Sequence, residues 1–208
     1  MIFALLRPLI FAPFDLCYYA REMRAAFALA AVLAIPAPAT VRLQIRVFDG
    51  REEVTADTRV TLYKAGAHDA PVAASSPRAA FDTSVPAGLY DAQVIRTRDS
   101  RVVNIRWAER LVVMPYPDEA GTHLEAINFQ SEFGALEVKG RSASTPRAAL
   151  YEAGSRDREA AQPLAGDGYL LFVVPAARYD LRVDSGGEVS WHAGIDVPRD
   201  RTRFWIVP

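Results

Sequence analysis

Cysteine and lysine are almost absent from this 208-residue chain. Cys17 is the only cysteine and lies among the first forty residues, so the chain beyond them can form no disulfide, no thiolate metal site and no cysteine nucleophile. The only lysines are Lys64 and Lys139, and the arginines are scattered among acidic residues. The net charge of −1 provides no broad positive field, so we predict no nucleic-acid partner.

Recognisable catalytic motifs are also missing. The sequence has no Gly-x-Ser-x-Gly nucleophile elbow, no phosphate-binding loop and no dinucleotide fingerprint. None of its three histidines, His68, His123 and His192, has a second histidine or an acidic residue at the spacing typical of a zinc site. We therefore predict no catalytic residue, no cofactor and no metal site, and we interpret the protein as non-enzymatic.

The first 39 residues differ in composition from the rest of the chain. Arg24 precedes an apolar run at residues 25–35, and the sequence Pro-Ala-Pro-Ala follows at 36–39. A positive charge, an apolar stretch and an Ala-x-Ala exit are the three parts of a secretory signal. We predict that residues 1–39 are a signal peptide or an N-terminal membrane segment, with Met23 as a possible true start. This predicts a periplasmic or secreted protein, with membrane contact only through this segment if it stays uncleaved.

An internal duplication follows the signal segment. Residues 59–66 (RVTLYKAG) match 147–154 (RAALYEAG), 88 positions later. Residues 85–91 and 174–180 share Val-Pro-Ala-x-x-Tyr-Asp at an offset of 89, and Trp107 matches Trp191 at an offset of 84. Three matches in the same order predict two related domains, at residues 40–130 and 134–208.

Both copies have the pattern of short β-strands. Apolar and polar residues alternate over residues 41–47, 103–107 and 179–184, which is typical of strands with one buried face. Turn residues separate these segments at short intervals, as at Asp49-Gly50 and at 185–187. We predict an all-β protein with two tandem antiparallel seven-stranded β-sandwich domains after an apolar helical signal segment.

The Pro-x-x-x-Tyr-Asp element predicts a tyrosine corner in each copy. Proline ends one strand, and the tyrosine that follows shares a face with apolar residues of the next strand. Tyr90 and Tyr179 should therefore point inward, with their hydroxyl groups bonded to the backbone near the corner. Asp91 and Asp180 should face outward and tie the turn.

Taken together, these motifs resemble the carboxypeptidase regulatory-like group. The resemblance rests on an opening alternating strand, Arg-x-x-Leu-Tyr-x-Ala-Gly, Val-Pro-Ala-Gly-x-Tyr-Asp and a late strand with tryptophan, and it covers both copies. It implies a prealbumin-like (transthyretin-like) seven-stranded sandwich. It also implies an accessory or interaction module of an exported protein rather than a particular reaction.

The aromatic residues suggest where binding could occur. Trp107 and Trp191 continue an apolar alternation through Ile105 and Val189, so we interpret them as core residues. Trp205 stands alone near the C-terminus, and we predict that it contacts a partner or the other domain. Partner-binding roles are also predicted for His192 and His123.

Three functions remain open. The first is an interaction or structural module that binds another exported or envelope protein through sheet edges or loops. The second is a carbohydrate-binding module that uses exposed aromatics, which burial of Trp107 and Trp191 would disfavour. The third is an enzyme with a site at the domain junction near His123 and Phe133, which requires a cleft there.

Overall fold

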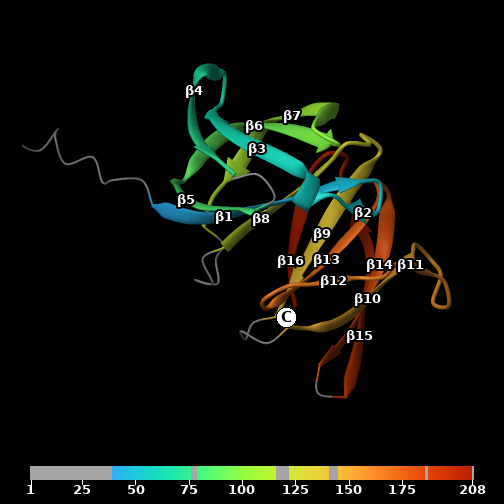
Figure 1. The fold of residues 1–208 in the computed structure, drawn as a ribbon. Helices are drawn as coiled ribbons and strands as arrows, with labels where there is room; N and C mark the ends of the chain where they lie inside the picture. The colour runs from blue at the N-terminus through green and yellow to red at the C-terminus, as the bar shows by residue number, and fades with distance from the viewer. Residues whose placement is uncertain (1–38, 76–78, 116–121, 141–144, 186, 208) are drawn as a thin grey trace, which may run out of the picture. The chain divides into compact units, whose positions relative to one another are not determined.

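A computed structural model describes residues 39–75, 79–115, 122–140, 145–185 and 187–207. The predicted signal segment lies outside these residues, apart from residue 39. The described part is built almost entirely of β-strands in four sheets, which confirms the all-β prediction (Figure 1). No helix in it is long and apolar enough to cross a membrane.

The first copy forms two four-stranded sheets. In one sheet β1 is central and pairs with β5, with β8 and with the short β2. The other sheet has the order β4-β3-β6-β7, and a 3₁₀ turn, η1, precedes β3. The elements are β1 (Thr40–Asp49), β2 (Glu52–Glu53), η1 (Thr55–Asp57), β3 (Thr58–Lys64), β4 (Ala67–Ala74), β5 (Phe81–Pro86), β6 (Gly88–Arg98), β7 (Arg101–Val113) and β8 (Thr122–Asn128).

The second copy repeats this arrangement except in its short strand, since β12 pairs with β13 whereas β2 pairs with β1. One sheet has the order β12-β13-β9-β16 and the other the order β11-β10-β14-β15. The elements are β9 (Phe133–Lys139), β10 (Arg147–Glu152), β11 (Glu159–Ala161), β12 (Leu164–Ala165), β13 (Tyr169–Pro175), β14 (Arg178–Ser185), β15 (Glu188–Asp196) and β16 (Thr202–Ile206).

The strand pairing shows that the duplication is one of topology as well as of sequence. The opening strand of each copy pairs antiparallel with the strand that ends in the corner proline, β1 with β5 and β9 with β13. It also pairs in parallel with the last strand, β1 with β8 and β9 with β16. The antiparallel prediction did not include this parallel pair, because alternation reports a buried face and not a strand direction.

Apolar side chains form three clusters. One lies between the two sheets of the first copy and a second between the two sheets of the second copy. The third contains Phe48, Leu124 and Ala126 from the first copy and Ala135, Leu171 and Val173 from the second. The β1 sheet therefore packs against the β9 sheet. We call these two the inner sheets, and we call β4-β3-β6-β7 and β11-β10-β14-β15 the outer sheets.

The two tyrosine corners are present as predicted. Tyr90 is fully buried, and its hydroxyl donates a hydrogen bond of 2.6 Å to the Pro86 carbonyl. The Tyr179 hydroxyl donates one of 2.7 Å to the Pro175 carbonyl. These bonds satisfy a buried hydroxyl where the backbone turns between strands, so the repeated motif is a structural element of the fold.

Candidate functional site

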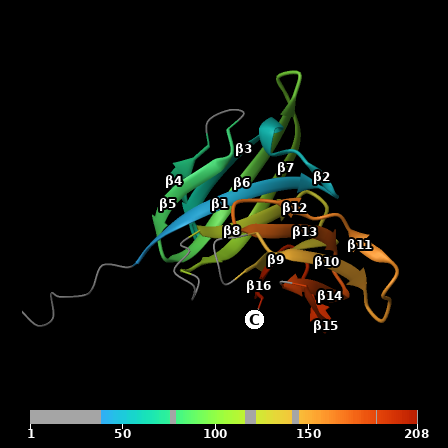
Figure 2. The ribbon, with the colours of Figure 1, turned by 90° about the horizontal axis from the view of Figure 1, so that it is seen from below.

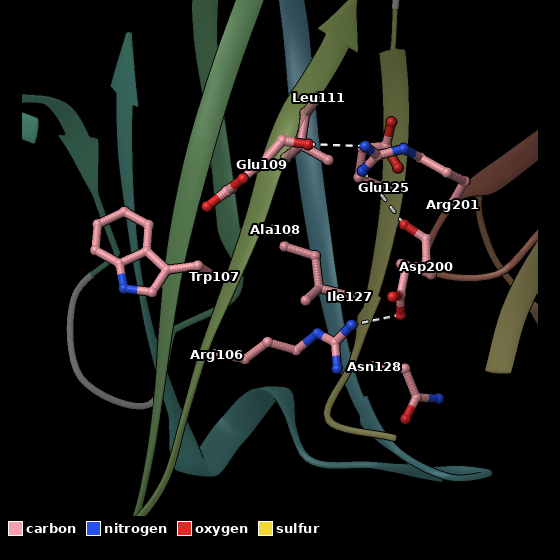
Figure 3. A pocket seen from close by; sticks show the side chains of 11 residues that line it. Arg106, Trp107, Ala108, Glu109, Leu111, Glu125, Ile127, Asn128, Asp200 and Arg201 are labelled. Carbon is pink, nitrogen blue, oxygen red and sulfur yellow. Dashed lines mark hydrogen bonds and ion pairs between the residues drawn. The ribbon is translucent and has the colours of Figure 1, made fainter. Parts of the chain in front are cut away.

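A pocket of about 170 Å³ lies where the two copies meet. It opens between β7 and β8 of the first copy and is bounded by the β15–β16 connection of the second (Figure 3). Its lining residues are Arg106, Trp107, Ala108, Glu109, Leu111, Glu125, Ala126, Ile127, Asn128, Asp200 and Arg201. Trp107 belongs to this wall through its backbone, since its ring points away from the other side chains in Figure 3.

Both arginines of the pocket hold the two copies together. Arg106 forms an ion pair with Asp200 and donates a hydrogen bond of 3.2 Å to the Phe129 carbonyl. Arg201 donates one of 2.8 Å to the Glu109 carbonyl. The described lining contains no serine, threonine, cysteine, lysine or histidine, and its acidic side chains are Glu109, Glu125 and Asp200, the last of which is paired with Arg106. The geometry is thus that of a polar joint between the copies.

His123, which we placed near a possible junction site, does not line this pocket. It is buried on β8, and its Nε2 lies 3.0 Å from Glu125 Oε1. Among the described residues, no group of three or more histidine, cysteine or acidic side chains could hold a metal ion. The hypothesis of an enzyme at the junction has the cleft it requires, but not a recognisable set of reacting groups.

The interpretation of Trp107 and Trp191 as core residues is wrong. Both are half-buried on the solvent-facing side of the outer sheets, while the neighbouring Ala108 faces the core. Trp107 pairs across the strands with Gln93, and Ile105 pairs with Ile95. The alternation correctly indicated a strand with one apolar face, but that face points outward.

One face of each of these half-buried tryptophans is covered by a neighbouring side chain. The His68 ring stacks on Trp107 with 4.4 Å between centroids and 25° between planes, and Tyr63 lies 5.5 Å from Trp107. In the second copy the Arg156 guanidinium lies 5.0 Å above the Trp191 ring, and Tyr151 lies 5.1 Å from it. A side chain that follows the β3 or β10 strand therefore occupies a ring face that a sugar would need. The covered rings do not favour the carbohydrate hypothesis.

Asp91 and Asp180 each bond to one turn and one strand elsewhere in the chain rather than to their own turn. Asp91 accepts hydrogen bonds from the backbone N–H groups of Gly66 and Arg110, at 2.8 and 2.7 Å. Asp180 accepts the equivalent bonds from Gly154 and Gly194, both at 2.9 Å. The prediction that both face outward is wrong for Asp91, which is 3% exposed under the β3–β4 hairpin.

Each aspartate thus fixes two backbone positions that have positive φ. These positions are Gly66 and Arg110 in the first copy, with φ of 76° and 56°, and Gly154 and Gly194 in the second, with φ of 79° and 69°. Arg110 is the only one of these four residues that is not glycine, so its positive φ costs more conformational energy. The Asp91 carboxylate compensates by accepting the Arg110 N–H.

These contacts lower the pKa of both carboxyl groups. Burial alone would raise the pKa of Asp91, but the N–H donors of Gly66 and Arg110 and the His68 ring, 2.8 Å away, outweigh it. For Asp180 the Gly194 and Gly154 donors lower the pKa against a smaller effect of burial. Both aspartates are therefore ionised structural acceptors.

Two of the predicted partner-binding residues lie together. His192 on β15 and Trp205 on β16 approach with 5.5 Å between ring centroids, and Trp205 packs against the core of the second copy. Arg203 lies 6.0 Å from the Trp205 ring and donates a hydrogen bond to the Asp196 carbonyl. Contact of these residues with a partner stays a prediction.

Among the described residues, five of the eight exposed large apolar side chains lie on the β6–β7 hairpin, which the sequence analysis did not single out. Val102, Val103 and Ile105 on β7 are 57%, 54% and 54% exposed. The hairpin turns through Asp99 and Ser100, both with positive φ as in a type I′ turn, and extends beyond the neighbouring strands (Figure 2). β7 is an edge strand, because it pairs with β6 and with no other described strand.

The other three edges of the outer sheets are blunted. β4 contains Pro71 and two register shifts, which interrupt an edge. β11 has only three residues. β15 has one strongly exposed large aliphatic side chain, Val189, and acidic residues at both ends. β7 also has two register shifts, near Val103 and Glu109, but it contains no proline and carries more exposed large aliphatic side chains than any other edge strand of the two outer sheets among the described residues.

Comparison with known proteins does not identify a family. No protein-family model matches the sequence, and no curated protein matches it significantly. Three solved structures show a distant similarity to the chain. The Bacillus anthracis TIE protein is 14% identical with a TM-score of 0.30, and the alignment covers 81% of this chain and 33% of that protein. The present chain thus spans about a third of that relative.

The other two are a fimbrial protein and a putative adhesin. The tip fimbrial protein Mfa3 from Porphyromonas gingivalis is 11% identical with a TM-score of 0.30, over 81% of this chain and 94% of that one. A putative adhesin from Bacteroides ovatus is 12% identical with a TM-score of 0.29, over 78% and 83%. At these values we infer neither a family nor a function from the likeness.

Proposed function

We propose that this protein is a non-enzymatic interaction module that binds another protein through the β6–β7 hairpin. The observation that carries the proposal is the group of exposed aliphatic side chains on β7, at Val102, Val103 and Ile105. Exposed aliphatic groups on an accessible sheet edge favour association with another polypeptide. The other outer-sheet edges lack this combination.

The remaining surfaces support a binding role rather than catalysis. The two arginines of the junction pocket join the copies, and the half-buried Trp107 and Trp191 are covered by His68 and Arg156. These groups have structural roles in a duplicated scaffold. The β6–β7 hairpin is therefore the feature that we propose for binding. The resemblance to carboxypeptidase regulatory-like domains supports an accessory role of this kind.

The partner belongs to the same compartment as the protein. The signal pattern at residues 23–39 supports export, so we propose a periplasmic or secreted partner, or one exposed on the cell envelope. The proposal requires no cofactor.

Photo-crosslinking in cells that natively produce the full chain tests the proposal. A photoreactive phenylalanine analogue replaces Ile105 in one variant and Val189 in the other. These are equivalent positions on β7 and β15, and both are exposed, at 54% and 44%. We expect a discrete protein adduct from position 105 that mass spectrometry identifies, and little from position 189. Equal adduct patterns at the two positions, or none at 105, would overturn the proposal.

A further inference from the structure

Two like charges face each other at the end of the β6–β7 hairpin. Arg98 and Arg101 are directly opposite across the strands, on either side of the Asp99-Ser100 turn. Both are exposed. Like charges directly opposite in a strand pair are destabilising, so the position is unfavourable for the isolated hairpin.

Nothing described in the chain relieves this repulsion. None of the described carboxylates lies within 4.0 Å of either guanidinium, although Asp99 stands in the same turn. By contrast, Arg96, which lies two residues before Arg98 on β6, forms a 2.6 Å ion pair with Asp49. The corresponding end of the β14–β15 hairpin pairs Ser185 with Glu188 and has no such conflict.

From this arrangement we infer that the hairpin recognises an extended acidic segment of a partner protein. A carboxylate of the partner is placed between Arg98 and Arg101, and aliphatic side chains that follow it contact Val102, Val103 and Ile105. Arginine suits this role because its planar fork of donors matches a carboxylate. The inference rests on the proposed function and adds the chemistry of the partner.

The order of residues along the hairpin favours a polypeptide over an anionic membrane. The tip is polar, with Asp99 and Ser100 at the turn, and the exposed aliphatic residues lie behind it on β7. Entry into a bilayer would bring the Asp99 carboxylate into the lipid first, which is unfavourable. Arg101 and Val102 are neighbours on β7 and point to opposite faces of the sheet. A polypeptide that lies along the β7 edge has side chains that alternate between the two faces, so it reaches both the arginines and the aliphatic side chains.

The inference is tested with the purified full chain and three probes. These are a short synthetic peptide with two aspartates followed by alternating valine and threonine, the same peptide with lysine in place of aspartate, and vesicles of phosphatidylglycerol. Binding of the acidic peptide should perturb the backbone NMR signals of residues 98–105 and weaken with added salt. Combining Arg98→Gln with Arg101→Gln should weaken it at least about tenfold.

The matched control combines Arg147→Gln with Arg178→Gln, two exposed arginines of the second copy, and should leave binding unchanged. Equal binding of the lysine peptide, binding to vesicles alone, or no binding of the acidic peptide would overturn the inference. The in-cell crosslink separates this from the proposed function. If the adduct at position 105 persists when both Arg98 and Arg101 are changed to glutamine, the hairpin binds a partner but does not recognise an acidic segment. The proposed function would then stand and this inference would be wrong.

Discussion

The two copies share strand order, parallel closing pair and tyrosine corner, yet their outer hairpins differ. In the first copy β6 and β7 have 11 and 13 residues, whereas β14 and β15 have 8 and 9. The cross-strand row Ile95–Ile105 of the first copy corresponds to Asp184–Val189 in the second. The shared features fix the scaffold, so the longer and more apolar hairpin is what distinguishes the first copy.

A second difference lies beside the shared aspartate. Asp91 is buried and accepts a bond from His68 as well as from two backbone groups, whereas the bonds to Asp180 are exposed. The cover over the tryptophan is likewise an imidazole in one copy and a guanidinium in the other. Both aspartates bond to backbone N–H groups, but those of the first copy are shielded from water. Equivalent substitutions in the two copies therefore measure the effect of burial on these bonds.

The largest expected effect comes from Leu62→Ala and Leu150→Ala. Both leucines are fully buried at equivalent positions, so each change should lower the free energy of unfolding by about 2–5 kcal/mol. If residues 40–130 and 134–208 are separate domains, as predicted, calorimetry should show that each variant lowers a different transition. A single transition that both variants lower alike would contradict that division.

Next in size is the contrast between Asp91→Asn and Asp180→Asn. Asparagine has one acceptor oxygen, so one backbone N–H loses its partner in each variant. Asp91→Asn should cost about 1–3 kcal/mol because its surroundings are buried, and Asp180→Asn less than about 1 kcal/mol because water can replace the bond. Urea unfolding measures both values. Equal losses would show that burial does not distinguish the two sites.

The same aspartates predict a loss of stability in acid. Their pKa values are lowered in the folded state, so the ionised carboxylates stabilise it above the unfolded value of about 3.9, and this contribution disappears as the pH falls through the folded values. Urea unfolding between about pH 6 and 2.5 should show a decline that is shallower in Asp91→Asn. Asp82→Asn should also make the decline shallower, because Arg42 lowers the pKa of that carboxyl group, so combining it with Asp91→Asn should remove more of the decline than either change alone. An unchanged slope in Asp91→Asn would contradict the assignment.

The sequence was sufficient for the fold class, the duplication and the tyrosine corners, because periodicity and repeated turn motifs report local constraints. It did not reveal which face of β7 is buried. Val103, Ile105 and Trp107 alternate just as core residues do, and only the pairing with β6 shows that Ile105 and Trp107 face solvent. The covers over the tryptophans depend on hairpin geometry, which one sequence does not display. The Arg98–Arg101 opposition depends on a two-residue turn, and Asp-Ser at 99–100 was the available signal for it.

The smallest predicted effect concerns that opposition in the absence of any partner. Arg98→Glu replaces a like-charge cross-strand pair by an opposite-charge pair, so it should raise the free energy of unfolding by about 0.2–1 kcal/mol. The gain should shrink in high salt, because both groups are exposed. Arg59→Glu, on the neighbouring β3, changes the net charge equally without facing another arginine, since Arg59 pairs with Ile95. A gain in Arg98→Glu but not in Arg59→Glu would show that the opposed arginines lower the stability of the folded chain. Such a local cost is typical of recognition sites, and the Ser185–Glu188 end of the second copy does not have it.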